Sequence, residues 1–382
     1  MDFSLTDEQV ALKESARRLC ERDYGFEHRR GLLRTVDGFS RDLWGTFAEL
    51  GWLGAGLSED EFGYGGGPVE TALLQEEFGR VLVVEPYLSC VVIAARAIAA
   101  LGDEAQKEAL LSAIVSGETL VALAHNEVAM RGDDAAITTV AASDGEGWRL
   151  NGRKGFILGG PSADLLLISA QTGTGVTLFQ VAADAPGVEI IAYHAVDGRR
   201  VADIILNNVR VEGAAVLGQV GAALPGIELA VDHGVIGLMA ECVGAMDAAL
   251  WLTRDYLKTR KQFGVTLNTF QALQHRMADM LVETELARSM LLRGVSALSD
   301  PDPVARRAAV SAAKVQITEA AVKVTAEGIQ MHGGIGVTEE YVVGHFYKRA
   351  VLAKGLFGGI DVHLQRFAAQ SAQAHSREVR AA

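Results

Sequence analysis

The stretch Arg260-Lys261-Gln262-Phe263-Gly264, with Gln271 further on, carries the most information about the fold and the site of this chain. It places a permanent cation, an aromatic ring and an amide around one predicted helix–turn–helix. A guanidinium has forked donors that match phosphate oxygens. Such a group can bind the pyrophosphate and adenine of a dinucleotide. Each residue also has a structural reading, because Gln271 can cap a helix and Arg260 can pair with an acid.

The residues around this stretch predict two consecutive helices. Leu250–Phe263 is predicted as a helix that Gly264 stops. Asn268 with Gln271 predicts a capping box for the next helix. Four apolar residues then recur at helical spacing and are predicted to face the core, namely Phe270, Leu273, Met277 and Met280.

A second motif is Gln330-Met331-His332-Gly333-Gly334-Ile335-Gly336-Val337. The Ala-rich stretch Val304–Gln330 predicts a long helix before it, and Thr338 is predicted to cap the helix after it. Glycines let a backbone turn and approach a ligand without a side chain in the way. The same pattern is also typical of a plain helix C-terminus.

Composition narrows the class of protein. A chain of 382 residues is long enough for two or three domains, and its formal charge of -13 argues against a nucleic-acid surface. Cys20, Cys90 and Cys242 form no C-x-x-C pair, so neither a metal site nor a disulfide framework is expected. The acidic N-terminus is unlike a signal peptide, and no uncharged apolar run is long enough to span a membrane. We expect a cytoplasmic protein.

The chain reads as helical, then β, then helical. The predicted domains are an N-terminal helical domain over residues 1–117, a middle β domain over 118–217 and a C-terminal helical bundle over 218–382. Thr6 is predicted to cap the first helix. The strands are expected in five short apolar runs, which are Leu120–Ala124, Leu165–Ser169, Val176–Val181, Val188–Ile191 and Asp203–Leu206.

Together these features resemble the acyl-CoA dehydrogenase family of flavoenzymes, which desaturate acyl-CoA thioesters. Weaker matches are Gly51-Trp52-Leu53-Gly54 and Gln75-Glu76-Glu77-Phe78-Gly79-Arg80. The resemblance covers essentially the whole chain. It implies an α+β fold with an N-terminal helical domain, a middle antiparallel β domain and a C-terminal four-helix bundle that mediates tetramer formation. It also implies FAD as cofactor, an acyl-CoA substrate and an electron-transfer acceptor.

The resemblance assigns cofactor-binding roles to six residues. Arg260 matches the residue that holds the flavin pyrophosphate, and Phe263 and Gln271 match residues at the adenine end. Gln330, Gly333 and Gly334 match the flavin-contacting turn. In the family these residues reach a flavin that sits mainly on a neighbouring subunit.

The chain departs from the family at the catalytic base. The implied reaction needs a carboxylate that removes the proton next to the thioester carbonyl while hydride leaves for the flavin. Many members carry this Glu in an aromatic-Glu-Gly-Thr segment, but here Leu356-Phe357-Gly358-Gly359-Ile360-Asp361 has none. In other members the base lies on the helix before the Arg motif, and that position is Gly234. Asp361, and less plausibly Asp232, are the nearest carboxylates, with a solvated surface role expected for each.

The segments that would hold this chain's own flavin ring also depart from the family. Asn126-Glu127-Val128-Ala129-Met130-Arg131-Gly132 replaces the usual Thr-Glu-Pro and Gly-Ser pattern. Phe156-Ile157-Leu158 replaces Trp-Ile-Thr, whose Thr hydroxyl bonds the isoalloxazine, and leucine cannot donate that bond.

Retained adenine-end residues with a missing base suggest an obligate heteromer. This chain would complete the FAD site of a homologous catalytic partner in an α2β2 heterotetramer. Such two-gene enzymes act in bacterial steroid degradation, so a bulky, ring-bearing acyl-CoA is the suggested substrate. Two alternatives stay open: a self-sufficient homotetramer with Asp361 as an unusual base, and a non-enzymatic scaffold that binds acyl-CoA.

Overall fold

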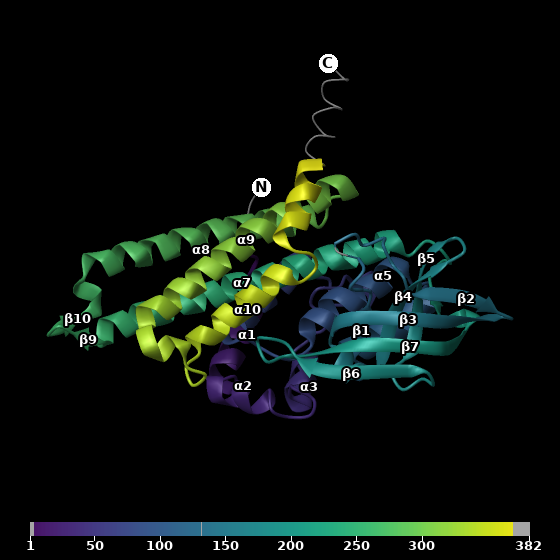
Figure 1. Ribbon diagram of the computed structural model, residues 1–382, viewed down its shortest axis with the longest axis horizontal. Coiled ribbons are helices and arrows are strands. Elements are labelled where there is room, and N and C mark those ends of the chain that lie inside the picture. The colour runs from purple at the N-terminus through teal and green to yellow at the C-terminus, as the bar shows by residue number, and fades with distance from the viewer. Residues whose placement is uncertain (1–3, 131, 370–382) are drawn as a thin grey trace, which may run out of the picture. The chain divides into compact units, whose positions relative to one another are not determined.

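The computed structural model describes residues 4–130 and 132–369, in the order helical, β, helical that the sequence predicts (Figure 1). Two compact units divide these residues. The bundle unit contains the chain up to Arg29, Ala72–Val83 and the chain from Val235 onward. The sheet unit contains Arg30–Thr71 and Val84–Gly234. The predicted domain boundaries stay predictions.

The N-terminal part is helical. Thr6 caps the first helix through a capping box with Gln9, as predicted. The helices are α1 (Asp7–Asp23), α2 (Phe26–Leu32), α3 (Arg41–Glu49), α4 (Pro68–Val81), α5 (Ala95–Leu101) and α6 (Glu104–Val115), with the short helical turns η1 (Glu59–Glu61) and η2 (Leu88–Ala94).

The sheet unit contains the strands of the middle region. They are β1 (Val121–Ala124), β2 (Val140–Asp144), β3 (Gly147–Leu158), β4 (Leu165–Thr172), β5 (Gly175–Ala182), β6 (Val188–His194), β7 (Arg200–Glu212) and β8 (Val216–Leu217). Their order is β6-β7-β3-β2-β4-β5-β8, and β1 pairs with β4. Most pairs are antiparallel as predicted, but β4 pairs in parallel with both β1 and β2. The sheet is therefore mixed.

The sheet closes over an apolar core. Its buried members include Leu150, Leu166, Ile168, Phe179 and Ile204. Trp148 packs against this cluster and meets Phe179 edge to face, with ring centroids 5.7 Å apart. These residues come from β3, β4, β5 and β7, so alternate positions of each strand fill the core.

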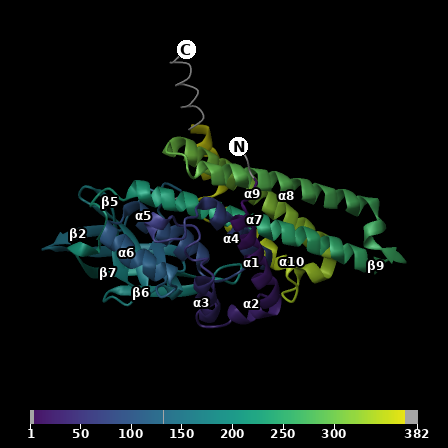
Figure 2. The same cartoon turned by 180° about the vertical axis from the view of Figure 1, so that it is seen from behind.

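Long helices form the bundle unit. They are α7 (Leu224–Thr259), of which the part from Val235 belongs to this unit, α8 (Gln271–Ala297), α9 (Pro303–His332) and α10 (Val343–Gly355). Helices α8 and α9 run side by side in both views (Figures 1 and 2). By length and composition α7 is apolar enough to cross a membrane, but 78% of its most apolar window is buried inside the protein. It therefore has the burial of a core helix.

The structure corrects the predicted helix ends near the first motif. Helix α7 ends at Thr259, and the hairpin strands β9 (Lys261–Gln262) and β10 (Val265–Thr266) follow it. The turn η5 (Leu267–Thr269) then leads into α8, whose N-cap is Phe270 without a side-chain bond. The Asn268–Gln271 capping box was wrong, because Asn268 lies inside η5.

Two further predictions in this region were wrong. Of the four residues predicted to face the core, only Met280 is buried, and Phe270 is exposed at the end of the bundle. Thr338 does not cap the next helix. It ends η6 (Gly333–Val337) and donates its hydroxyl to the carbonyl of Ile335, and α10 begins later at Val343.

Candidate functional site

The first motif lies at the hairpin end of the bundle unit. Arg260 links the end of α7 to the turn before α8, since its carbonyl accepts the Leu267 N–H at 2.9 Å. Its side chain is exposed, and its guanidinium has no hydrogen-bond or ion-pair partner within residues 4–130 and 132–369. Phe263 is 91% exposed at a positive φ of 53°, and its ring meets that of Phe270 edge to face with centroids 6.2 Å apart. Gln271 is also exposed, in the first turn of α8.

The second motif lies at the same end of the bundle. Gln330, Gly333 and Gly334 are exposed at the end of α9. Gly333 has a φ of +66°, and side-chain atoms added at either glycine would meet open space. The backbone of this turn is therefore open to close approach by a ligand.

A stack of rings joins the two motifs. Tyr256, one helical turn before Arg260, stacks on buried His332 with ring centroids 4.4 Å apart and donates its hydroxyl to the His332 carbonyl at 3.2 Å. His332 Nδ1 donates to the Gly328 carbonyl at 2.7 Å, so Nε2 accepts from the Tyr341 hydroxyl at 3.2 Å. Burial lowers the pKa of His332, which keeps the ring neutral in this arrangement. The sequence reading missed this stack.

This end of the bundle fits the adenosine-diphosphate half of a dinucleotide. It offers an exposed guanidinium for phosphate, an exposed aromatic ring for stacking, two exposed amides and an open glycine turn. Phe263 points away from its own chain. A ligand held by Arg260 and Phe263 therefore needs a second surface to cover it.

The segment that would meet a flavin ring lies in the sheet unit. Phe156 sits at a bulge where the register of β3 against β7 shifts, with a positive φ of 55°. Asp203 on β7 accepts the Phe156 N–H at 3.1 Å and the Tyr193 hydroxyl at 2.8 Å, and pairs with Arg153 at 2.5 Å. Although partial burial opposes it, these donors lower the pKa of Asp203. Its carboxylate is therefore ionised.

Asn126, which follows β1, also forms its hydrogen bonds within the chain. Asn126 donates its side-chain amide to the Gly155 carbonyl at 2.7 Å, and the Gly155 N–H donates back to the Asn126 carbonyl at 2.9 Å. Leu158, half-buried on β3, has no hydroxyl. These residues do not fit an isoalloxazine ring, whose N1, N5 and two carbonyl oxygens require donors. Arg131, in the loop that follows Asn126, lies outside the described residues.

Glu127 is retained from the family pattern and is structural here. It is buried and pairs with Lys154 at 2.6 Å. It also accepts the N–H and hydroxyl groups of Thr138 and Thr139. Burial alone would raise the pKa of Glu127, but Lys154 and the threonines lower it to about 2. The carboxylate thus anchors the loop between β1 and β2 as a permanent anion.

Neither position of the family's base offers a carboxylate. Gly358 has a φ of +100°, and a Cβ there would lie 3.4 Å from both His363 and Val362. Gly234 is buried within α7. Asp361 is exposed, as expected. Asp232 is buried with 1% of its surface exposed, so the expected surface role for it was wrong.

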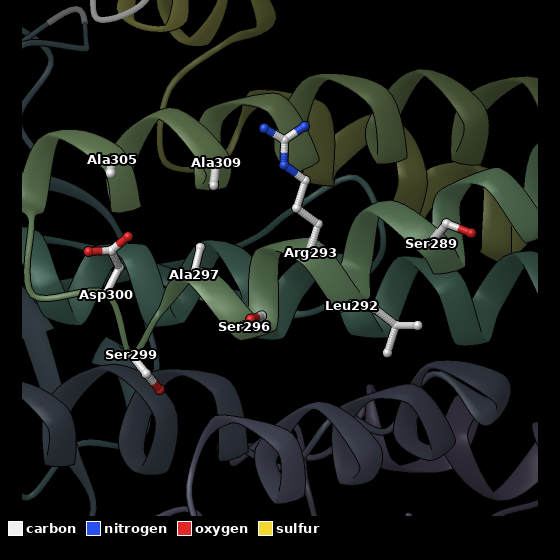
Figure 3. A pocket seen from close by; sticks show the side chains of 9 residues that line it. All are labelled: Ser289, Leu292, Arg293, Ser296, Ala297, Ser299, Asp300, Ala305 and Ala309. Atoms are coloured by element: carbon white, nitrogen blue, oxygen red, sulfur yellow. The ribbon is translucent and has the colours of Figure 1, made fainter. Parts of the chain in front are cut away.

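A pocket of about 670 Å³ lies between the end of α8 and the start of α9 (Figure 3). It is lined by Ser289, Leu292, Arg293, Ser296, Ala297, Ser299, Asp300, Ala305 and Ala309. Because α8 begins and α9 ends at the hairpin end, this pocket is separate from Arg260, Phe263 and the glycine turn.

The helical–β–helical order and the exposed residues at the hairpin end suit a flavin-dependent dehydrogenase. Comparison with known proteins identifies the family. The acyl-CoA dehydrogenase N-terminal, middle and C-terminal domain families match residues 6–118, 122–209 and 226–372. The chain belongs to the acyl-CoA dehydrogenase family, and this membership implies FAD as cofactor.

Relatives and solved structures agree. The chain is 31% identical over 363 residues to the probable acyl-CoA dehydrogenase YngJ of Bacillus subtilis, covering 92% of this chain and 94% of the relative. A variant of the Tcur3481-Tcur3483 steroid ACAD is 31% identical, with a TM-score of 0.88 over 97% of this chain and 99% of that chain. The ChsE4-ChsE5 complex from Mycobacterium tuberculosis is 27% identical, with the same TM-score and coverage.

Proposed function

We propose that this chain is the subunit that completes the FAD site of a homologous catalytic chain in an α2β2 acyl-CoA dehydrogenase. The carrying observation is the hairpin between α7 and α8, where Phe263 is exposed and the Arg260 guanidinium has no partner among the described residues. On an isolated chain the Phe263 ring stays in contact with water, and covering it would be favourable. The Arg260 guanidinium likewise has no role there. A cofactor bound to a neighbouring chain would cover the ring and pair with the guanidinium.

The base positions support the same division of labour. FAD, when bound, accepts the hydride that the substrate loses. The accompanying proton requires a positioned carboxylate, which neither Gly358 nor Gly234 can supply. Asp361 is solvent-exposed and lacks the burial that would poise a base. The partner would therefore perform the deprotonation, and this chain would bind the adenosine-diphosphate half of the cofactor.

The substrate we propose is a bulky acyl-CoA such as a steroid-derived one. One similar solved structure supports this substrate, because it is a steroid ACAD. Another supports the heteromer, because it is a complex of two differently named chains. The three cysteines are buried and form no disulfide with one another, which supports the proposal of a reducing, cytoplasmic location. An electron-transfer protein would take the electrons from the cofactor.

Coexpression with the homologous chain encoded beside it tests the proposal. The pair should copurify with FAD absorbance and dehydrogenase activity, while this chain alone should bind little FAD. Arg260→Ala should release FAD from the pair, because it removes the phosphate contact. Arg210→Ala, an exposed arginine on the sheet, is the matched control and should retain FAD. Full FAD occupancy and turnover by the lone chain would reject the proposal.

A further inference from the structure

Asp203 accepts hydrogen bonds from the donors beside Phe156–Leu158, the segment that would meet a flavin ring. Its Oδ1 accepts both the Phe156 N–H and the Tyr193 hydroxyl, and its Oδ2 faces Arg153. Asp203 and Tyr193 lie on the paired strands β7 and β6, while Phe156 lies on β3 at the other side of β7. One carboxylate therefore ties three neighbouring strands together at the bulge.

The bulge is strained and needs this support. A phenylalanine at a positive φ is a backbone outlier that persists only when its surroundings fix it. The bond from the Phe156 N–H to Asp203 supplies such a constraint. Bulges also re-aim side chains. Here the Phe156 ring meets Tyr193 edge to face, with centroids 6.2 Å apart.

An isoalloxazine makes a specific demand on a surface. Its N1, N5 and two carbonyl oxygens accept hydrogen bonds, and only its N3–H donates. At this segment the Phe156 N–H and the Tyr193 hydroxyl are taken by Asp203, and one of the two Asn126 amide hydrogens is taken by Gly155. Leu158 adds no side-chain donor. An acceptor-rich ring would regain few of its bonds to water here, which is a net cost.

We propose that Asp203 closes this chain's own flavin-ring segment, so that flavin rings in the assembly are held by the partner only. The inference rests on the proposed function and deepens it. In this proposal two features keep a flavin ring from binding at Phe156–Leu158. One is the Asp203 carboxylate with its donors, which we call the Asp203 clamp, and the other is the missing threonine hydroxyl. A complex with equal numbers of both chains then holds one FAD per pair.

Riboflavin, which has the ring without phosphates or adenine, tests the closed segment directly. The wild-type chain should leave riboflavin fluorescence unquenched. Asp203→Ala with Leu158→Thr frees two donors and adds a third, so riboflavin affinity should rise at least about tenfold, the worth of one or two recovered hydrogen bonds. Asp144→Ala with Leu158→Thr is the matched control. Asp144 pairs with Arg149 at 2.9 Å elsewhere on the sheet, so releasing it should give no such gain.

The possible results separate the role of Asp203 from the proposed function. Riboflavin binding by the wild-type chain, or an equal affinity of both double variants, would overturn the role of Asp203. Circular dichroism and thermal melting check that the variants fold. Two FAD per pair of chains in the purified complex would also overturn the role of Asp203, but the proposed heteromer would stand. Failure of the two chains to associate would instead reject the proposed function.

Discussion

At the scale of single residues, the buried polar cluster under β1 shows how charge is kept inside the sheet unit. Lys154 donates to Glu127 at 2.6 Å and to the Ser169 hydroxyl at 3.0 Å. The same Ser169 hydroxyl lies 3.0 Å from His125 Nδ1 and shares a hydrogen bond with it. The other ring nitrogen, His125 Nε2, is buried without a hydrogen-bond partner in the described part of the chain.

His125 should make the stability of the chain depend on pH. Burial first, and then Lys154, lower the pKa of His125 to about 4, against the influence of Asp134 and Glu127. A histidine whose folded pKa is depressed stabilises the fold above its unfolded value of about 6.5 and loses that contribution as pH falls towards about 4. Between about pH 7 and 5 the free energy of unfolding should fall by about 2 kcal/mol through this residue.

Chemical denaturation at several pH values measures this prediction. Burial also lowers the pKa values of His332 and His345, so the wild-type slope has several sources. The difference between wild type and His125→Leu isolates His125. An unaltered slope in His125→Leu would contradict the prediction.

At the scale of elements, α4 and α7 pack at backbone distance inside the bundle unit. A Cβ on Gly244 would lie 1.8 Å from the Glu76 carbonyl oxygen, and one on Gly79 would lie 2.0 Å from that of Glu241. Both obstacles are backbone atoms of a neighbouring helix. The contact therefore requires glycine on each side.

Gly244→Ala should destabilise the protein because the two helices must separate to admit the methyl group. Overpacking of this kind costs about 1–3 kcal/mol. The matched control is Gly45→Ala in α3, where nothing lies within 4 Å of an added Cβ. Alanine there should stabilise the helix by about 0.5–1 kcal/mol. Equal unfolding free energies of the two variants would refute the close contact.

Hydrogen bonds from buried side chains fix the turn after α10. Lys314 donates to the carbonyls of Ala353 and Leu356, and His363 Nε2 donates to the Phe357 carbonyl at 3.0 Å. Gly358 follows at a φ of +100°. Buried side chains thus hold the backbone at the position where relatives carry their base.

A glutamate introduced at Gly358 should destabilise the fold. Gly358→Glu forces a side chain into a left-handed conformation and should cost about 1–3 kcal/mol of unfolding free energy. Gly359→Glu, where an added Cβ meets nothing within 4 Å and φ is not positive, should cost much less. Denaturant titration compares the two. A Gly358→Glu protein as stable as wild type would remove the argument.

The element order and many helices could be predicted from sequence, and the exceptions have physical causes. Strand β3 was not among the predicted runs because Arg149, Arg153 and Lys154 interrupt its apolar residues. Lys154 is buried only because Glu127, distant in sequence, neutralises it. The hairpin after α7 was read as helix because its residues carry no strong turn signal before Gly264.

Part of the candidate site could be predicted from sequence and part could not. The two sequence motifs identified Arg260, Phe263, Gln271 and the glycine turn, and the structure places them at one end of the bundle. Their roles in binding FAD stay predictions. The Asp203 clamp could not be predicted, because strand register alone brings Asp203 to Phe156 and Tyr193. The positive φ of Phe156 has no signal in sequence.

At the scale of the whole molecule, α8 carries four exposed apolar residues, which are Leu281, Val282, Leu286 and Leu292. At 100° per residue these four fall within about 140° of the helix, an arc that they share with Glu285, Ser289 and Arg293. Leu292 also lines the pocket between α8 and α9 (Figure 3). Exposed apolar residues gathered on one side of a helix are typical of a surface that another chain covers.

Leu286→Glu should therefore break the assembly while leaving the chain folded. Leu286 is 52% exposed, so a glutamate there is tolerated in the free chain, but a covering chain would bury its charge at a cost of several kcal/mol. The association constant should fall at least about a hundredfold. Light scattering after size exclusion measures the mass. Val36→Glu, at an 84% exposed loop position, is the matched control and should assemble normally. An unchanged mass for Leu286→Glu, with normal circular dichroism, would mean that this face stays free in the assembly and that the exposed hairpin must find its neighbour through another surface.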